Sequence, residues 1–310
     1  MPRTVPLFRS AWGVLKSEWH GGKFTSLDEF FAATKALQYT GVEMPVVTCL
    51  QYEEEHGEGS LREVLDRHGL QLICTAFSSG FMAPGTHFDS CLAPSDSDID
   101  THVRVLCEQY RLARHRFGAY RINTHSGMPG WTLDTCRHFY DTVHNELVRM
   151  SMDVDVVHET HRGRALFSPW TTLQLVRDLG DALNLNADLS HWVVVSEAFP
   201  VTQDGDFAFV YPELSSIVQK IASNVKHVHA RFSDSQRSQL PQPQLSRHFA
   251  DREAHLELWH RILSQNCAVS VTPEHGPVPY QLTLNEEDDL VCDLWQVNTW
   301  VGQQVQSRAL

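Results

Sequence analysis

Eight short β-rich runs alternate with longer amphipathic stretches along this 310-residue chain. The stretch "SLDEFFAATKALQYT" (26–40) places apolar residues at helical spacing behind Ser26, a residue type that favours the helix N-cap. The stretch "SPWTTLQLVRDLG" (168–180) begins with Ser and Pro and ends with Gly, which are the usual signals for the start and the end of a helix. The candidate strands cover residues 6–14, 41–47, 70–78, 119–127, 153–161, 185–191, 225–233 and 267–276.

This alternation predicts βαβ units and a parallel sheet. Eight such units favour an α/β fold of the (β/α)8 TIM-barrel type, with outer helices, over an open doubly wound sheet. No G-x-G-x-x-G motif follows the first run, which weakens a dinucleotide-binding alternative. We expect a single domain over residues 1–310. The Pro-, Gln- and Ser-rich segment 233–254 follows the seventh predicted strand, and we expect it to be an active-site loop.

The composition narrows the classes of partner and compartment. A formal net charge of −13 repels phosphate backbones, so nucleic acid is not an expected partner. The seven cysteines are scattered without a C-x-x-C pair, a pattern typical of thiols in a reducing compartment. The stretch "MPRTVPLFRSAWGV" lacks the long apolar run expected of a secretory signal, and no run approaches the roughly 20 apolar residues that a membrane span needs. These features predict a soluble cytoplasmic protein with no membrane partner.

Four of the later strands end in an ionisable residue. Alternate residues of a strand share a face, so Glu159, Asp188, His229 and Glu274 each lie near the C-terminal end of one strand face. In a barrel these strand ends meet at one mouth. Three carboxylates gathered there would repel each other unless a divalent cation neutralised them. Two Glu, one Asp and one His suit Mn²⁺, Mg²⁺ or Co²⁺ better than a closed structural zinc site.

The motifs that carry these residues resemble those of the xylose isomerase-like TIM barrels, a superfamily of sugar-phosphate isomerases and epimerases. The resemblance rests on "VVHETHRGR", "NADLSHW", "HVHARFS" and "VTPEHGP", and in the first half only on "GVEMP" and "THSG". The segment "ARFSDSQRSQLPQPQ" after the seventh strand departs from the short charged motif that relatives often carry there.

The resemblance implies that the four strand-end residues hold one divalent metal ion. Mn²⁺ is the expected ion, and Mg²⁺, Co²⁺ and Zn²⁺ are the alternatives. The resemblance also implies that the two glutamates of this set, Glu159 and Glu274, are catalytic and move protons. His191, Arg231 and Arg164 would contact the substrate. From their strand positions, three further residues are expected to line the same pocket, namely His125, His161 and Glu43.

Several alternatives stay open at this point. Glu159 could pair with Arg162 or Arg164, and His227 shares a strand face with His229 and could replace it as a ligand. His275 could be exposed at the surface. The tryptophans that could form an apolar wall for a sugar ring, or simply pack in the core, are Trp12, Trp131 and Trp192.

The function predicted first is a metal-dependent isomerase or epimerase of a ketose, polyol or keto acid that works through a metal-stabilised enediolate. A lyase or dehydratase, of the dehydroshikimate type or eliminating from oxidised glycosides, would use the same metal and proton abstraction. A phosphodiesterase resembling AP endonucleases is disfavoured by the net charge. A non-catalytic barrel that binds a metabolite or a partner is disfavoured, because a site without catalytic activity has no need to hold three carboxylates together. A homo-oligomer is possible on any of these readings.

Overall fold

The computed structural model describes residues 4–16, 21–79, 98–152, 154–197, 200–203, 206–209, 212–284 and 291–308. Its main sheet is parallel. A parallel β-bridge between Leu7 and Val271 connects the first strand to the last, and the Val271 N–H donates to the Pro6 carbonyl at 2.9 Å. The strands follow the order β1 (Phe8–Ser10), β2 (Gly41–Pro45), β3 (Gln71–Phe77), β4 (Arg121–His125), β5 (Asp155–Glu159), β6 (Leu185–Ala187), β9 (Val225–Ala230) and β10 (Ser270–Pro273). The chain is therefore a TIM barrel, which confirms the predicted fold class.

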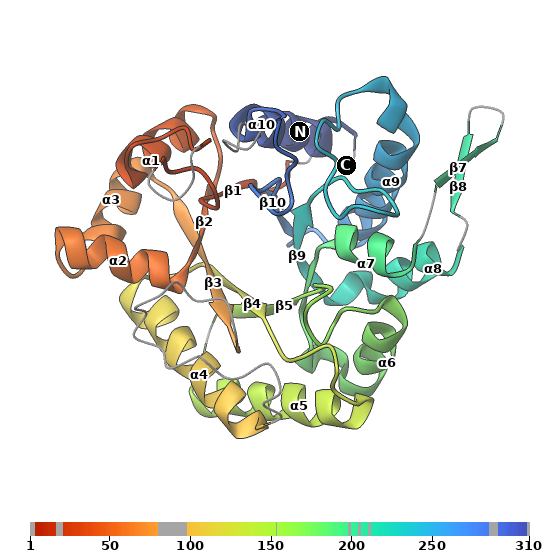
Figure 1. Ribbon diagram of the computed structural model, residues 1–310. Coiled ribbons are helices and arrows are strands. Elements are labelled where there is room, and N and C mark those ends of the chain that lie inside the picture. Colours follow the sequence, from red (N-terminus) through yellow and green to blue (C-terminus); the bar gives the residue numbers. More distant parts are fainter. Residues whose placement is uncertain are drawn as a thin grey trace.

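Helices surround this barrel on the outside (Figure 1). They are α1 (Leu27–Ala36), α2 (Val46–His56), α3 (Ser60–His68), α4 (Ile99–Arg111), α5 (Leu133–Arg149), α6 (Pro169–Leu179), α7 (Leu189–Val195), α8 (Pro212–Ile221), α9 (Phe249–Gln265) and α10 (Leu294–Arg308). Between α7 and α8 the chain forms an antiparallel hairpin of β7 (Pro200–Gln203) and β8 (Asp206–Phe209). The hairpin projects outward from the ring of helices in Figure 1. The sequence analysis did not anticipate this hairpin.

The helix signals in the sequence act as expected. The Ser26 side chain accepts the Glu29 N–H at 3.3 Å at the start of α1. The Ser168 side chain accepts the Thr171 N–H at 3.4 Å at the start of α6, and Gly180 ends that helix with φ of 55°. Each cap satisfies a backbone group that the helix itself leaves without a partner. The α1 and α6 stretches therefore form where their local sequence predicts.

The loop that follows β9 is shorter than the sequence predicted. Residues 249–254 form the first turns of α9, so only the earlier part of the predicted 233–254 loop is irregular, with a 3₁₀ turn at Ser246–His248. Gln239 fastens this loop to the loop after β10, because its side chain both accepts the Gly276 N–H at 2.8 Å and donates to the Gly276 carbonyl at 2.9 Å. The role of this loop in activity stays a prediction.

Polar side chains occupy the barrel interior, whereas aliphatic residues fill most barrels of this class. Asn186 donates to Asn123 at 3.1 Å, and Arg121 donates to the Ser270 hydroxyl and the Lys226 carbonyl. The apolar core lies instead between the sheet and the helices, where it includes Phe30, Leu106, Phe139, Val218 and Ile262. Polar groups buried in the interior must be paired, so this arrangement fixes the relative heights of the strands.

The described cysteines are free thiols, most of them buried. Cys49, Cys74, Cys107 and Cys136 are buried and free, and Cys91 lies outside the described residues. Across the described ranges, every helix falls short of the length and apolar character that crossing a bilayer requires.

His158 makes the stability of the fold sensitive to acid. Its side chain points away from the barrel interior, with Nδ1 3.0 Å from the Ser126 hydroxyl and the ring edge-on to Tyr140. Burial lowers the pKa of His158 to about 3. The unfolded chain binds a proton here below pH of about 6.5, whereas the folded chain does not until about pH 3, so stability is lost as the pH falls from 6.5.

We expect His158→Asn to make the fall in unfolding free energy between pH 6.5 and pH 5 shallower, by up to about 2 kcal/mol at pH 5. Urea denaturation at a series of pH values measures this. The control is His138→Asn, a change at an exposed position on α5. Equal pH dependence in wild type and His158→Asn would contradict this account.

Candidate functional site

The four strand-end residues meet at one mouth of the barrel. Glu159 is the last residue of β5, Asp188 follows β6 as the N-cap of α7, His229 lies on β9, and Glu274 follows β10. The His229 Nδ1 atom is 3.4 Å from Glu159 Oε2 and 2.9 Å from Glu274 Oε2. Asp188, His229 and Glu274 offer ligand atoms within 4.8 Å of one another. The structure thus brings together all four residues, and their role as ligands stays a prediction.

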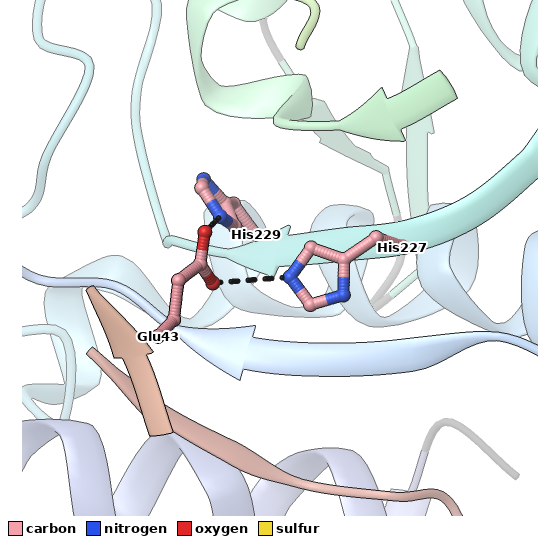
Figure 2. A group of neighbouring side chains, drawn as sticks. All are labelled: Glu43, His227 and His229. Carbon is pink, nitrogen blue, oxygen red and sulfur yellow. Dashed lines mark hydrogen bonds and ion pairs between the residues drawn. The ribbon is translucent and has the colours of Figure 1, made fainter. Parts of the chain in front are cut away.

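Glu43 on β2 lies beneath His229, and its carboxylate faces both His227 and His229 (Figure 2). Oε1 is 3.0 Å from His229 Nε2, and Oε2 is 3.2 Å from His227 Nε2. Burial alone would raise the pKa of Glu43, but His229 and His227 lower it well below its usual value. Three further donors also reach this carboxylate, namely Thr75, Asn123 and Thr272.

Glu43 fixes which nitrogen of His229 carries a proton. An ionised carboxylate can only accept hydrogen bonds, so Nε2 of His229 is the protonated nitrogen, and Nδ1 of the neutral ring presents a lone pair. Nδ1 faces Glu159 and Glu274, yet within the described part of the chain it makes no hydrogen bond of acceptable geometry. Three electron-pair donors therefore converge on one point, which requires a proton or a cation between them.

The surroundings of His229 fit a divalent cation. Burial lowers the pKa of His229, but Glu274, Glu43 and Glu159 together raise it well above the usual value, so without an ion the ring holds an extra proton there. A divalent cation at Nδ1 would replace that proton and neutralise more of the negative charge. Carboxylate oxygens with one imidazole suit Mn²⁺, Mg²⁺, Co²⁺ or an open zinc site.

Glu159 is held as a carboxylate by neutral donors and histidines. Asn123 donates to its Oε2 at 2.9 Å, and His125 Nε2 lies 3.1 Å from the same oxygen. Burial would raise the pKa of Glu159, but His125 and His229 lower it well below its usual value. Among the described residues, Glu159 forms no ion pair with Arg162 or Arg164, the pairing considered as an alternative. Arg164 instead donates to the Ser79 carbonyl at 2.8 Å.

Arg231 lies between the two remaining carboxylates. Its Nη2 contacts Asp188 closely, lies 3.0 Å from Glu274 Oε2 and is 3.4 Å from His191 Nε2. The side chain is 2% exposed, and its Nε and Nη1 atoms have no hydrogen-bond partner within the described ranges. Burial lowers the pKa of Arg231, but Asp188 and Glu274 raise it overall, so the guanidinium stays charged. Two nitrogens of this buried cation, Nε and Nη1, thus have no protein partner in the described part of the chain.

The histidines predicted to face the substrate form one wall. The His161 ring lies 4.0 Å from that of His191 and 5.2 Å from that of His125, measured between centroids. Burial, with Arg231 nearby, lowers the pKa of His191 well below its usual value, and burial, with His191 nearby, does the same for His161. These two rings are therefore neutral hydrogen-bonding groups near pH 7.

Some residues at the site escaped the sequence analysis. Asn123 shares the inward face of β4 with His125, and the alternation in "RINTH" could have revealed it. Tyr280, in the loop after β10, reaches His161 at 3.1 Å and carried no periodic signal. Trp12 packs edge-on against Tyr280, with 5.3 Å between ring centroids.

Other expectations need correction or restatement. His275 is 1% exposed, so the alternative of a surface position for it is wrong. Trp131 packs against His102 and Phe139, and Trp192 is fully buried, so of the three tryptophans only Trp12 lies beside Tyr280. The contacts of Glu43 described above are all to protein groups, and the substrate contact predicted for it stays a prediction.

A family model described as xylose isomerase-like TIM barrel matches residues 31–264. The chain belongs to this family. No curated protein sequence matches it. The match extends from within α1 to near the end of α9 and so includes six of the eight strands of the barrel, β2 to β6 and β9.

Solved structures share the fold at low sequence identity. The IOLI protein with a bound zinc atom has a TM-score of 0.63 at 12% identity, covering 98% of this chain and 99% of the other. The probable 3-DHS dehydratase AsbF from Bacillus anthracis has a TM-score of 0.58 at 11% identity, with coverage of 97% and 99%. D-psicose 3-epimerase with D-tagatose, from Clostridium cellulolyticum H10, has a TM-score of 0.56 at 11% identity, with coverage of 98% and 96%. These likenesses establish the architecture, and the reaction must be argued from the site.

We expect Glu43→Gln to weaken Mn²⁺ binding by about 10- to 100-fold, because an amide no longer fixes the His229 tautomer. Titration of the metal-free protein with Mn²⁺, with free Mn²⁺ followed by electron paramagnetic resonance, measures the affinity. Glu108→Gln on the exposed face of α4 is the control and should bind Mn²⁺ as wild type does. Unchanged affinity in Glu43→Gln would contradict the tautomer argument.

Proposed function

We propose that the chain is a divalent-metal-dependent isomerase or epimerase of a ketose, polyol or keto acid, with Glu159 and Glu274 as the groups that move protons. The observation that carries this proposal is the placement of both carboxylates against Nδ1 of His229, beside Asp188. Mn²⁺ is the proposed ion because the donor set is rich in oxygen, with Mg²⁺, Co²⁺ and Zn²⁺ as alternatives. The likeness to D-psicose 3-epimerase supports a sugar substrate.

The two glutamates have opposite protonation tendencies. Glu159 has a pKa held well below its usual value, so it is the carboxylate that accepts a proton from the carbon beside the substrate carbonyl. Burial raises the pKa of Glu274, which suits it to hold a proton and return it to the opposite face. When bound, a divalent ion supplies Lewis acidity at the substrate oxygens. In the reverse direction the two residues exchange roles.

The other predicted residues would orient the substrate. Arg231 offers its Nε and Nη1 hydrogens, and the neutral ring of His191 offers a hydrogen bond at Nδ1 without adding charge. His161, whose ring packs on His191, would line the same side of the substrate. His125 holds Glu159 and would limit which way its carboxylate turns. Arg164, fixed by the Ser79 carbonyl, would add positive charge at the edge of the pocket. Fixed donors of this kind stabilise the negative charge that develops on substrate oxygens.

Hydrogen exchange tests the proposal. Mn²⁺-loaded protein in D₂O should place deuterium on the carbon beside the carbonyl of at least one ketose among D-psicose, D-tagatose, D-fructose and L-ribulose, as seen by proton NMR. Glu159→Gln and Glu274→Gln should each slow this exchange by about 10²- to 10⁴-fold, because each removes one proton-transfer group. Glu108→Gln should exchange at the wild-type rate. No exchange across ketoses and keto acids, or full exchange in either glutamate variant, would contradict the proposal.

A dehydratase is the second candidate, since the pocket also carries hydroxyl and imidazole donors at Tyr280 and His161 that could assist a leaving hydroxyl. The likeness to the probable 3-DHS dehydratase supports it only at the level of the fold. We expect 3-DHS to develop a new conjugated absorbance with Mn²⁺-loaded protein if this reading holds. Unchanged absorbance alongside ketose exchange would favour the epimerase.

A further inference from the structure

Tyr280, in the loop after β10, lies at the mouth of the barrel beside His161, His191 and Arg231. Its ring lies 4.7 Å from the guanidinium carbon of Arg231 and 5.4 Å from that of Arg162, and Trp12 packs against it edge-on. Its hydroxyl oxygen lies 3.1 Å from His161 Nε2. His161 in turn offers a ring nitrogen within 4.8 Å of Glu159 and His125. Tyr280 is therefore one side chain away from the proposed proton acceptor.

The direction of the hydrogen bond between His161 and Tyr280 follows from a neighbouring backbone group. The Gly163 N–H donates to His161 Nδ1 at 3.0 Å, so Nδ1 carries a lone pair. The proton of the neutral ring must then be on Nε2, and Nε2 donates to the Tyr280 oxygen. The Tyr280 oxygen is the acceptor in this contact, and its own hydrogen points elsewhere.

That hydrogen has no acceptor within the ranges that the structure describes, since the contact with His161 is the one hydrogen bond of the Tyr280 hydroxyl there. Burial raises the pKa of Tyr280, and the two guanidinium groups beside the ring oppose that rise, so the phenol keeps its hydrogen near pH 7. A phenol whose oxygen already accepts one fixed hydrogen bond presents its own hydrogen in a restricted direction.

We propose that Tyr280 is a substrate-contacting residue that donates its hydroxyl hydrogen to a substrate oxygen on the side of the pocket lined by His161 and His191. This inference rests on the proposed function and extends it. It implies that the substrate extends beyond the two oxygens that a cation would engage and carries a hydroxyl or carbonyl oxygen beneath Tyr280. A positioned donor that loses its acceptor discriminates against an analogue lacking that oxygen.

Binding of D-threonohydroxamate tests the assignment, because its hydroxamate chelates divalent metals in the geometry of an enediolate and its hydroxyls extend beyond the metal. Calorimetric titration of Mn²⁺-loaded protein should give a dissociation constant about tenfold higher for Tyr280→Phe than for wild type. Mn²⁺ affinity and Tm should not change, because the ring and its stacking remain. Tyr120→Phe, at a half-exposed tyrosine that packs on Phe8, is the matched control and should bind as wild type does.

A second variant separates loss of the hydroxyl from a change in packing. His161→Phe keeps an aromatic ring against His191 but removes the N–H that orients the Tyr280 hydroxyl, so it should also weaken the hydroxamate. The double variant should be weaker than wild type by less than the product of the two single effects, because both act on one hydrogen bond.

Two outcomes would overturn the assignment in distinguishable ways. Hydroxamate affinity in Tyr280→Phe within twofold of wild type would overturn the role of Tyr280 and leave the metal-dependent function standing. Wild-type protein that does not bind the hydroxamate in saturating Mn²⁺ would overturn the proposed function, and the role of Tyr280 with it.

Discussion

The geometry of the site depends on one buried carboxylate at the centre of the barrel. Glu43 is reached by five donors from four other strands, and a carboxylate so far from water is stable only when its lone pairs are occupied in this way. The hydrogen bond from His229 Nε2 is the one with chemical consequences, since it leaves Nδ1 as the atom that binds a proton or a cation at the mouth. The polar interior thus sets both the strand positions and the state of the central histidine.

The same hydrogen-bond network gives the Glu159 and Glu274 carboxylates different surroundings. Asn123 donates to Glu43 and to Glu159, so the residue beneath the site and the proposed base are held by one amide. Glu274, at the other edge, shares Arg231 with Asp188. Histidine contacts keep Glu159 ionised, whereas burial favours a proton on Glu274. Environment alone therefore gives two chemically identical side chains different properties.

The sequence predicted the barrel and its mouth because both depend on short-range patterns. Alternation along a strand tells which residues share a face, and parallel strands bring their C-terminal ends together, so Glu159, Asp188, His229 and Glu274 could be grouped without coordinates. Alternation says nothing about pairing across the barrel, and the contacts that Glu43 makes with His227 and His229 were missed for that reason. The start of α9 was missed because its N-cap residue makes no side-chain cap hydrogen bond. Tyr280 was missed because it lies in a loop, where the sequence has no periodic pattern.

A crystal structure of the protein grown with Mn²⁺, with anomalous diffraction to locate the metal, tests the central claim most directly. The account predicts one ion bound by Nδ1 of His229 and by the carboxylates of Glu159, Asp188 and Glu274, with Nε2 of His229 still hydrogen-bonded to Glu43. An ion seated between Glu43 and His227, a ring turned so that Nε2 binds the ion, or a site without manganese at saturating concentration would contradict it.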